Sequence, residues 1–241
     1  EIHASYSEKV YEKLAAKGYA VYDFFLPGLL IDALERGNAD MLAGWAQEIL
    51  DKHILTVNML GCHDGIPMLD LKGLLPEERI QSLIDLIVSR GGMVKNLHGQ
   101  KNVYYQVNAT YYSALGENDA KLLMARVIQM FMPGKPQVWY LDLFAGKNDY
   151  DAVARAGEGG HKEINRTNLT RAQIEEALEK PIVTKQLELL RMRCNCPAFA
   201  PGADVSIESR GHVLTIEWKH DGHTACLQAD LQKLTYHIDT V

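Results

Sequence analysis

Two titratable residues, His63 and Asp64, directly follow the most apolar predicted strand of the chain, residues 54–60. In barrels and open α/β sheets, ligands bind at the carboxyl ends of the strands. Gly61 and Gly65 flank the pair, and glycine lets a ligand approach the backbone closely. The position therefore indicates a candidate site. The alternative is structural, with Asp64 capping the next turn and His63 serving as a polar loop residue.

A second candidate is the segment 86–116, which contains no Asp or Glu. This positive stretch in an acidic protein would suit an anionic substrate, and the alternative is a solvated basic loop. Within it, residues 103–112 hold four tyrosines and two side-chain amides, which suit sugar binding but also ordinary half-buried strands. Residues 157–163 are rich in glycine but lack the spacing of a nucleotide-binding loop. The basic residues of the segment 86–116 are Arg90, Lys95, His98 and Lys101.

The elements that must position these residues alternate between strands and helices. Because parallel neighbours need crossover connections, such alternation indicates a parallel α/β sheet or barrel. A closed (β/α)8 barrel typically needs about 250 residues, and three strands cannot close one. Four short strands predicted between residues 205 and 239 indicate a small antiparallel β domain. The other predicted strands are 19–24, 54–60 and 137–143, and the predicted helices are 7–17, 29–35, 41–50, 77–90, 119–132 and 170–193.

Composition excludes several classes of protein. The chain has 241 residues, a formal charge of −6 and 47% apolar residues, which argues against disorder, collagen and coiled coil. Net acidity argues against nucleic acid as a partner. No apolar run approaches the roughly 18 to 20 residues that span a membrane, and no signal-peptide layout is visible, so we expect a cytoplasmic protein. We interpret the four cysteines as free thiols: Cys62, Cys194, Cys196 and Cys226.

Five motifs in order resemble the sucrose phosphorylase group of the α-amylase superfamily, over nearly the whole chain. They are residues 60–66, 105–116, 133–140, 145–149 and 164–166. The resemblance implies an α/β fold, the C-terminal half of a (β/α)8 TIM barrel followed by a small antiparallel β domain. We predict a partial barrel over 1–198, with an inserted loop region at about 62–116, and the β domain over 199–241.

The resemblance also implies roles for individual residues. The family's retaining mechanism uses an Asp nucleophile and a Glu acid/base. Residues 1–6 resemble the motif of that glutamate, so Glu1 would be the proton donor. Asp64 would hold sugar hydroxyls and stabilise the oxocarbenium-like transition state, and His63 would bond another hydroxyl. Tyr105 and Gln106 match the acceptor and phosphate loop.

Two departures bear on the substrate. Where sucrose phosphorylases carry an Asp-hydrophobic pair, this chain has Val103 and Tyr104. Where they carry the motif Gly-Arg-x-Ile-Asn-Arg, this chain has residues 160–166, a longer segment that lacks the first arginine of that motif. Both variants look most like the glucosylglycerate phosphorylases, whose acceptor product is the anion glycerate. The stretch without carboxylates fits an anionic acceptor and phosphate. The candidate binding residues for these groups are His98, Lys101, His161 and Lys162.

The chain begins at Glu1 without a methionine and contains no Arg-x-Asp, the motif of the nucleophile. We therefore expect a fragment that is inert alone, because an acid/base residue cannot form the glycosyl-enzyme intermediate. The intact enzyme would convert glucosylglycerate and inorganic phosphate into α-glucose 1-phosphate and glycerate, without metal or organic cofactor. The alternatives are a sucrose phosphorylase, a hydrolase, and a non-catalytic half-barrel carbohydrate-binding protein whose open sheet edges a partner covers. A homodimer of the intact enzyme is an additional hypothesis.

Overall fold

The computed structural model of the chain describes residues 1–96 and 104–241. Its first part is built on three neighbouring parallel strands, with Val21 of the first opposite Thr56 of the second and Val57 of the second opposite Lys135 of the third. The strands are β1 (Val21–Asp23), β2 (Thr56–Asn58) and β6 (Lys135–Pro136). Long helical crossovers separate them in sequence, as parallel neighbours require. The prediction of a partial α/β barrel is confirmed.

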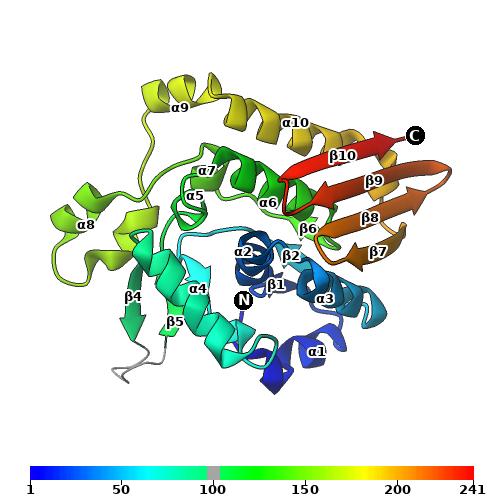
Figure 1. The fold of residues 1–241 in the computed structure, drawn as a ribbon, viewed down its shortest axis with the longest axis horizontal. Helices are drawn as coiled ribbons and strands as arrows, with labels where there is room; N and C mark the ends of the chain where they lie inside the picture. Colours follow the sequence, from blue (N-terminus) through cyan, green and yellow to red (C-terminus); the bar gives the residue numbers. More distant parts are fainter. Residues whose placement is uncertain (97–103) are drawn as a thin grey trace.

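The crossover helices surround the short strands in Figure 1. Their apolar faces form most of the buried core, with Leu30, Trp45 and Phe131 each at most 2% exposed. The helical elements before β6 are η1 (Tyr6–Glu8), α1 (Val10–Ala15), α2 (Leu26–Arg36), α3 (Asp40–Asp51), η2 (Leu69–Leu71), α4 (Glu77–Ser89), α5 (Tyr111–Ala114) and α6 (Asp119–Phe131).

A buried carboxylate joins β1 to the two helices that follow it. Asp23 ends β1, and its Oδ1 accepts hydrogen bonds from the backbone N–H groups of Phe25 and Leu26 at 3.2 and 3.0 Å. The indole N–H of Trp45 on α3 donates to both carboxylate oxygens at 3.1 Å. Burial raises the pKa of Asp23 to about 6, although these hydrogen bonds oppose the rise. The carboxylate thus satisfies donors at the start of α2 and orients α3.

The predicted inserted region contains a sheet of its own. Strands β3 (Ile66–Pro67) and β4 (Met93–Asn96) both pair antiparallel with the central β5 (Tyr104–Asn108). Helix α4 covers this sheet, and the buried Ile87 and Val107 belong to the same core. This small sheet follows the β2 exit directly, so it lies where it can support the candidate site.

The predicted strand over 137–143 is wrong. The third parallel strand is the shorter β6, and α7 (Tyr140–Leu143) occupies most of the predicted range. Its buried residues Leu141 and Asp142 are adjacent in sequence, whereas a half-buried strand buries alternate residues. The apolar and aromatic composition of the range is therefore explained by a helical turn packed into the core.

Two predicted helices are interrupted. The predicted helix 7–17 is divided into η1 and α1 by Lys9, whose φ of 52° is left-handed. The predicted helix 170–193 is divided into α9 (Arg171–Leu178) and α10 (Pro181–Asn195), because the residue before a proline disfavours the helical region. The capping box of Thr170 and Gln173 at the start of α9 is confirmed. Between α7 and α9 lie α8 (Tyr150–Ala156) and the 3-10 helix η4 (Gly160–Asn165).

The C-terminal part is a four-stranded antiparallel sheet, as predicted, and its strand order is β10-β9-β8-β7. Figure 1 shows it at one side of the molecule, with α10 along one edge and α3 near the other. It follows η5 (Pro197–Phe199), and its strands are β7 (Asp204–Arg210), β8 (Val213–His220), β9 (His223–Asp230) and β10 (Thr235–Thr240). Leu214, Ile216 and Leu227 are fully buried and join the core of the α/β part. The division of the chain at 198/199 stays a prediction. Across the two described ranges, no helix is long and apolar enough to span a membrane.

Candidate active site

The carboxyl ends of the parallel strands carry the candidate site. Strand β2 continues through the buried Met59 and Leu60 into the turn 61–65. Strand β6 leads into Trp139, whose ring centroid lies 6.1 Å from that of His63. The two strand ends therefore meet at one edge of the sheet, which is where α/β enzymes bind their ligands.

Asp64 lies among three cationic or ionisable side chains. Its Oδ1 accepts hydrogen bonds from Lys162 Nζ at 3.2 Å and from Arg166 Nη2 at 3.1 Å. Its Oδ2 lies 3.5 Å from His63 Nε2. Burial raises the pKa of Asp64, but the Lys162 hydrogen bond and the neighbouring positive charges outweigh burial and lower it overall. Asp64 is thus a carboxylate at neutral pH, the form that can stabilise a developing positive charge.

Side chains from distant segments hold the backbone of the turn that carries His63 and Asp64. Asn165 Nδ2 donates to the carbonyl of Cys62 at 2.7 Å, and Arg166 Nε donates to the carbonyl of His63 at 2.9 Å. Asn108 Nδ2 donates to the carbonyl of Asp64 at 2.8 Å. Because Asn108 and Asn165 are at most 1% exposed, their own positions are set by the core. The turn is therefore preorganised by β5 on one side and by the end of η4 on the other.

Of the predicted binding residues, the structure brings Lys162 directly to Asp64. His161 precedes it on η4 and is half-buried. Gln106 is buried at 5% exposure on β5, opposite Pro67 of β3. Tyr105 lies on the same strand, but its side chain is outside the described part of the chain. His98 and Lys101 also lie outside the described residues.

Glu1 lies exposed at the first position, and the residues after it are anchored at the end of β1. The ring of His3 stacks on Phe24 with a centroid distance of 3.9 Å, and its Nδ1 lies 3.1 Å from Asp70 Oδ2. The backbone N–H of Ala4 donates to Asp70 Oδ1 at 3.3 Å. Burial raises the pKa of Asp70, and the contact with His3 opposes this rise. Since β1 and β2 are parallel, the anchored segment lies at the same edge of the sheet as His63.

Sequence reasoning missed three residues that build the site, Asn108, Asn165 and Arg166. The signal was present, because Asn165 and Arg166 belong to the motif 164–166 and Asn108 lies in the segment rich in tyrosine and amides. In the basic segment 86–116, Arg90 forms a bidentate ion pair with Glu35, from Nη1 to Oε1 at 2.9 Å and from Nη2 to Oε2 at 3.1 Å. That guanidinium therefore has a structural role.

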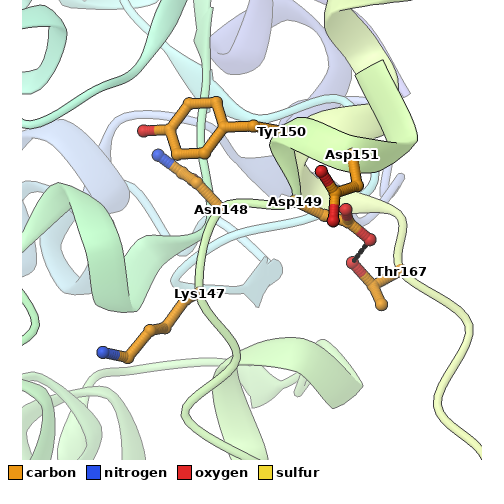
Figure 2. A pocket seen from close by; sticks show the side chains of 6 residues that line it. All are labelled: Lys147, Asn148, Asp149, Tyr150, Asp151 and Thr167. Atoms are coloured by element: carbon orange, nitrogen blue, oxygen red, sulfur yellow. Dashed lines mark hydrogen bonds between the residues drawn. The ribbon is translucent and has the colours of Figure 1, made fainter. Parts of the chain in front are cut away.

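An open hollow of about 290 Å³ lies beside the segment that carries Asn165 and Arg166. Figure 2 shows the hydrogen bond between Asp149 and Thr167 among the residues that line the hollow, with Lys147 turned away from them. Asp149 Oδ2 accepts from Thr167 Oγ1 at 2.9 Å, and the backbone N–H of Asp149 donates to the carbonyl of Ile164. These contacts of Asp149 hold the chain on both sides of Asn165 and Arg166. Among the described residues, no group of three or more His, Cys, Asp or Glu side chains is placed to hold a metal ion.

Comparison with known proteins gives close relatives over most of the chain. The chain is 52% identical over 240 residues to a sucrose 6(F)-phosphate phosphorylase of Ilumatobacter coccineus, covering 96% of this chain and 46% of that protein. It is 28% identical to a glucosylglycerate phosphorylase of Escherichia coli, covering 80% of this chain and 37% of that protein. No protein-family model matches the chain.

A solved structure of the same kind superposes closely. The crystal structure of sucrose 6F-phosphate phosphorylase from Thermoanaerobacter thermosaccharolyticum matches with a TM-score of 0.91 and 36% identity, over 100% of this chain and 48% of that one. This chain thus spans about half the length of the curated relatives that it matches.

Proposed function

We propose that this chain, a relative of the sucrose phosphorylase group over nearly all its length, is part of a longer enzyme that transfers an α-glucosyl unit to phosphate. The observation that carries the proposal is the ionised Asp64 beside His63, preorganised at the end of β2. In a retaining mechanism, Asp64 would stabilise the oxocarbenium-like transition state and Glu1 would protonate the leaving oxygen. The remaining part of the enzyme would supply the Asp nucleophile. The product would be α-glucose 1-phosphate.

For the glucosyl donor, we propose sucrose 6(F)-phosphate, which carries its phosphate on the fructosyl unit. The support is the 52% identity to a protein named for that substrate, against 28% to a glucosylglycerate phosphorylase. Glucosylglycerate remains the second candidate, favoured by residues 103–104 and 160–166. Both leaving groups are anions, whereas fructose is neutral. Lys162 and Arg166 supply positive charge beside Asp64, which agrees with an anionic leaving group.

We also propose that the enzyme acts in the cytoplasm, with the glucoside and inorganic phosphate as its partners. The four cysteines are free thiols, and free thiols are typical of a reducing compartment. A homodimer is an additional hypothesis. Sedimentation of the complete protein tests it, because a homodimer has twice the mass of one chain.

The test is phosphorolysis by the complete protein that contains this chain. We expect α-glucose 1-phosphate from sucrose 6(F)-phosphate, less from glucosylglycerate, and least from sucrose, each measured at equal donor and phosphate concentrations. Retention is read from the anomeric proton signal at early times. Release of free glucose without any need for phosphate would instead identify a hydrolase. Faster turnover of glucosylglycerate than of sucrose 6(F)-phosphate would reverse the proposed substrate order.

The same assay tests the role of Asp64. Asp64→Asn removes the charge but keeps the size, and we expect the turnover to fall by about 100-fold to 1000-fold, the range for losing one preorganised electrostatic contact. Asp85→Asn is the matched control, because Asp85 is exposed on α4 and bonds only Gln81 among the described side chains. Equal activity of the two variants would exclude the proposed role.

A further inference from the structure

The first amide of the site turn is held by a buried carboxylate that the proposed chemistry does not use. The backbone N–H of Gly61 donates to Oδ2 of Asp142 on α7 at 2.9 Å. Asp142 is completely buried. A Cβ at position 61 would lie 3.0 and 3.1 Å from the two carboxylate oxygens and 3.3 Å from Cβ of Tyr111. Glycine at position 61 therefore lets the carboxylate approach the backbone closely.

A second buried group of opposite charge, Arg126 on α6, acts on Asp142 through its charge, without a direct ion pair between the two described side chains. Both residues are 0% exposed. Burial raises the pKa of Asp142 and lowers that of Arg126, and in each case the charge of the partner opposes the shift. Asp142 Oδ1 and Arg126 Nη2 have no hydrogen-bond partner among the described residues. Two buried charges are costly for stability, and this cost calls for a reason to keep them.

Two glutamines link the pair to the ends of the parallel strands. Arg126 donates from Nε to Gln186 Oε1 at 2.8 Å and from Nη1 to Gln129 Oε1. Gln129 Nε2 donates to the carbonyl of Asn58, the last residue of β2, at 3.1 Å, and to that of Gln137 at 3.0 Å. Gln186 also donates to the α7 backbone. The network therefore connects the exits of β2 and β6 with α7, which carries Asp142.

We propose that Asp142 is a positioning residue, which holds Gly61 so that the following turn presents His63 and Asp64 correctly, with Arg126 supplying the balancing charge. A carboxylate forms a stronger hydrogen bond to a backbone N–H than a neutral acceptor does. The other amide and carbonyl contacts of the turn come from β5 and η4, so Asp142 is the link between the turn and α7. The inference rests on the proposed function for its catalytic readout.

Two variants of the complete protein separate positioning from simple stability. Asp142→Asn keeps an acceptor for Gly61 but weakens this hydrogen bond and leaves the Arg126 charge unbalanced, so we expect a lower melting temperature and a turnover reduced by about threefold, a smaller loss than in a variant without any acceptor. The double variant Asp142→Leu with Arg126→Met removes both charges but also the acceptor. Replacing a buried ion pair by apolar residues is often neutral or stabilising. We therefore expect it to recover the melting temperature while turnover stays at least tenfold reduced. Recovery of both would show that Asp142 serves stability alone and would overturn the proposal.

A second readout does not depend on turnover. His63 lies 6.1 Å from the ring of Trp139, so the ring-carbon NMR signal of His63 reports the position of the turn. We expect this signal to keep its chemical shift in the control Asp85→Asn, to move in the double variant, and to move less in Asp142→Asn. An unchanged signal in a folded double variant would overturn the proposal. If no donor is phosphorolysed by the parent protein, the proposed function fails, and the NMR signal still decides the role of Asp142.

Discussion

At the scale of single residues, a carboxylate in this protein acquires its properties from its partners rather than from its burial alone. Asp23 and Asp142 are completely buried, and burial raises their pKa. Asp64 is more exposed, and Lys162 and Arg166 help to lower its pKa. Glu48 is the strongest example of lowering of the pKa, because Lys52 donates a hydrogen bond to it at 2.8 Å, and Tyr11 and Tyr6 each donate one at 2.6 Å. The ionised form of such groups is part of the stability of the fold.

Glu48 gives a prediction for the dependence of stability on pH. Burial opposes its ionisation, but hydrogen bonds from Lys52, Tyr11 and Tyr6 lower its pKa from 4.5 to about 2. A lowered carboxyl pKa stabilises the fold above the unfolded value and loses this contribution as the pH falls from about 4.5 towards 2. We expect Glu48→Gln to lower the free energy of unfolding by about 2 kcal/mol at pH 7.

The measurement is urea unfolding of parent and variant between pH 7 and pH 3.5. The difference between them should decrease as the pH falls below 4.5. Glu158→Gln serves as the control, since Glu158 is exposed and should show no such trend. A difference of constant size over the whole range would contradict the proposed role of the Glu48 charge.

At the scale of elements, the pairing of β6 with β2 depends on the turn before it. Gly134 has φ of +108°, and an added Cβ would lie 2.6 Å from the carbonyl oxygen of Thr56 on β2. Thr56 Oγ1 and Asn58 Nδ2 both donate to the carbonyl of Pro133, at 2.9 and 3.2 Å. The polar side chains of β2 thus hold the turn against the strand. Because this packing fixes the two-residue strand β6 against β2, Trp139, which follows β6, lies beside His63.

Gly134→Ala should therefore disrupt the junction between β2 and β6. We expect a loss of at least about 3 kcal/mol in the free energy of unfolding, because the backbone of Thr56 cannot move without breaking the pairing. Gly211→Ala is the matched control, with φ of +64° and no atom within 4 Å of the added Cβ. It should cost only about 1 kcal/mol, from the left-handed backbone. Equal costs in thermal or urea unfolding would contradict the predicted clash.

At the scale of the whole molecule, one hydrophobic core joins the α/β part and the C-terminal sheet. Trp218 of β8 lies at this junction, and its indole N–H donates to the carbonyl of Phe131 at 2.7 Å. The ring of Phe199 packs against it at 5.4 Å, and the Arg193 guanidinium lies 4.5 Å from its centroid. Because the two parts share their buried surface, they should unfold together.

Trp218→Ala should lower the free energy of unfolding by about 3 to 5 kcal/mol, the usual cost of deleting a buried aromatic side chain. Tyr19→Ala, which changes a side chain that is 60% exposed, should have little effect. In the parent, the loss of helix, measured by circular dichroism, and the loss of amide protection in β8 should have the same unfolding midpoint. Earlier melting of the sheet in the parent would show that the two parts are independent.

Local patterns in the sequence determined much of this fold. The four C-terminal strands, the capping box of Thr170 and Gln173, and the place of His63 and Asp64 after β2 all follow from short-range preferences and spacing. The resemblance carried by five motifs agrees with relatives and a solved structure. The roles of Glu1, His63 and Asp64 stay predictions.

The tertiary structure alone decided which distant residues complete the site. Asn108, Asn165 and Arg166 are separated from the turn by between 44 and 103 positions, so no local preference could pair them with it. The helical turn that carries Asp142 was predicted as strand, because its aromatic and apolar composition suits both states. Packing against α10 selects the helix there, and the same packing brings a buried carboxylate close to Gly61.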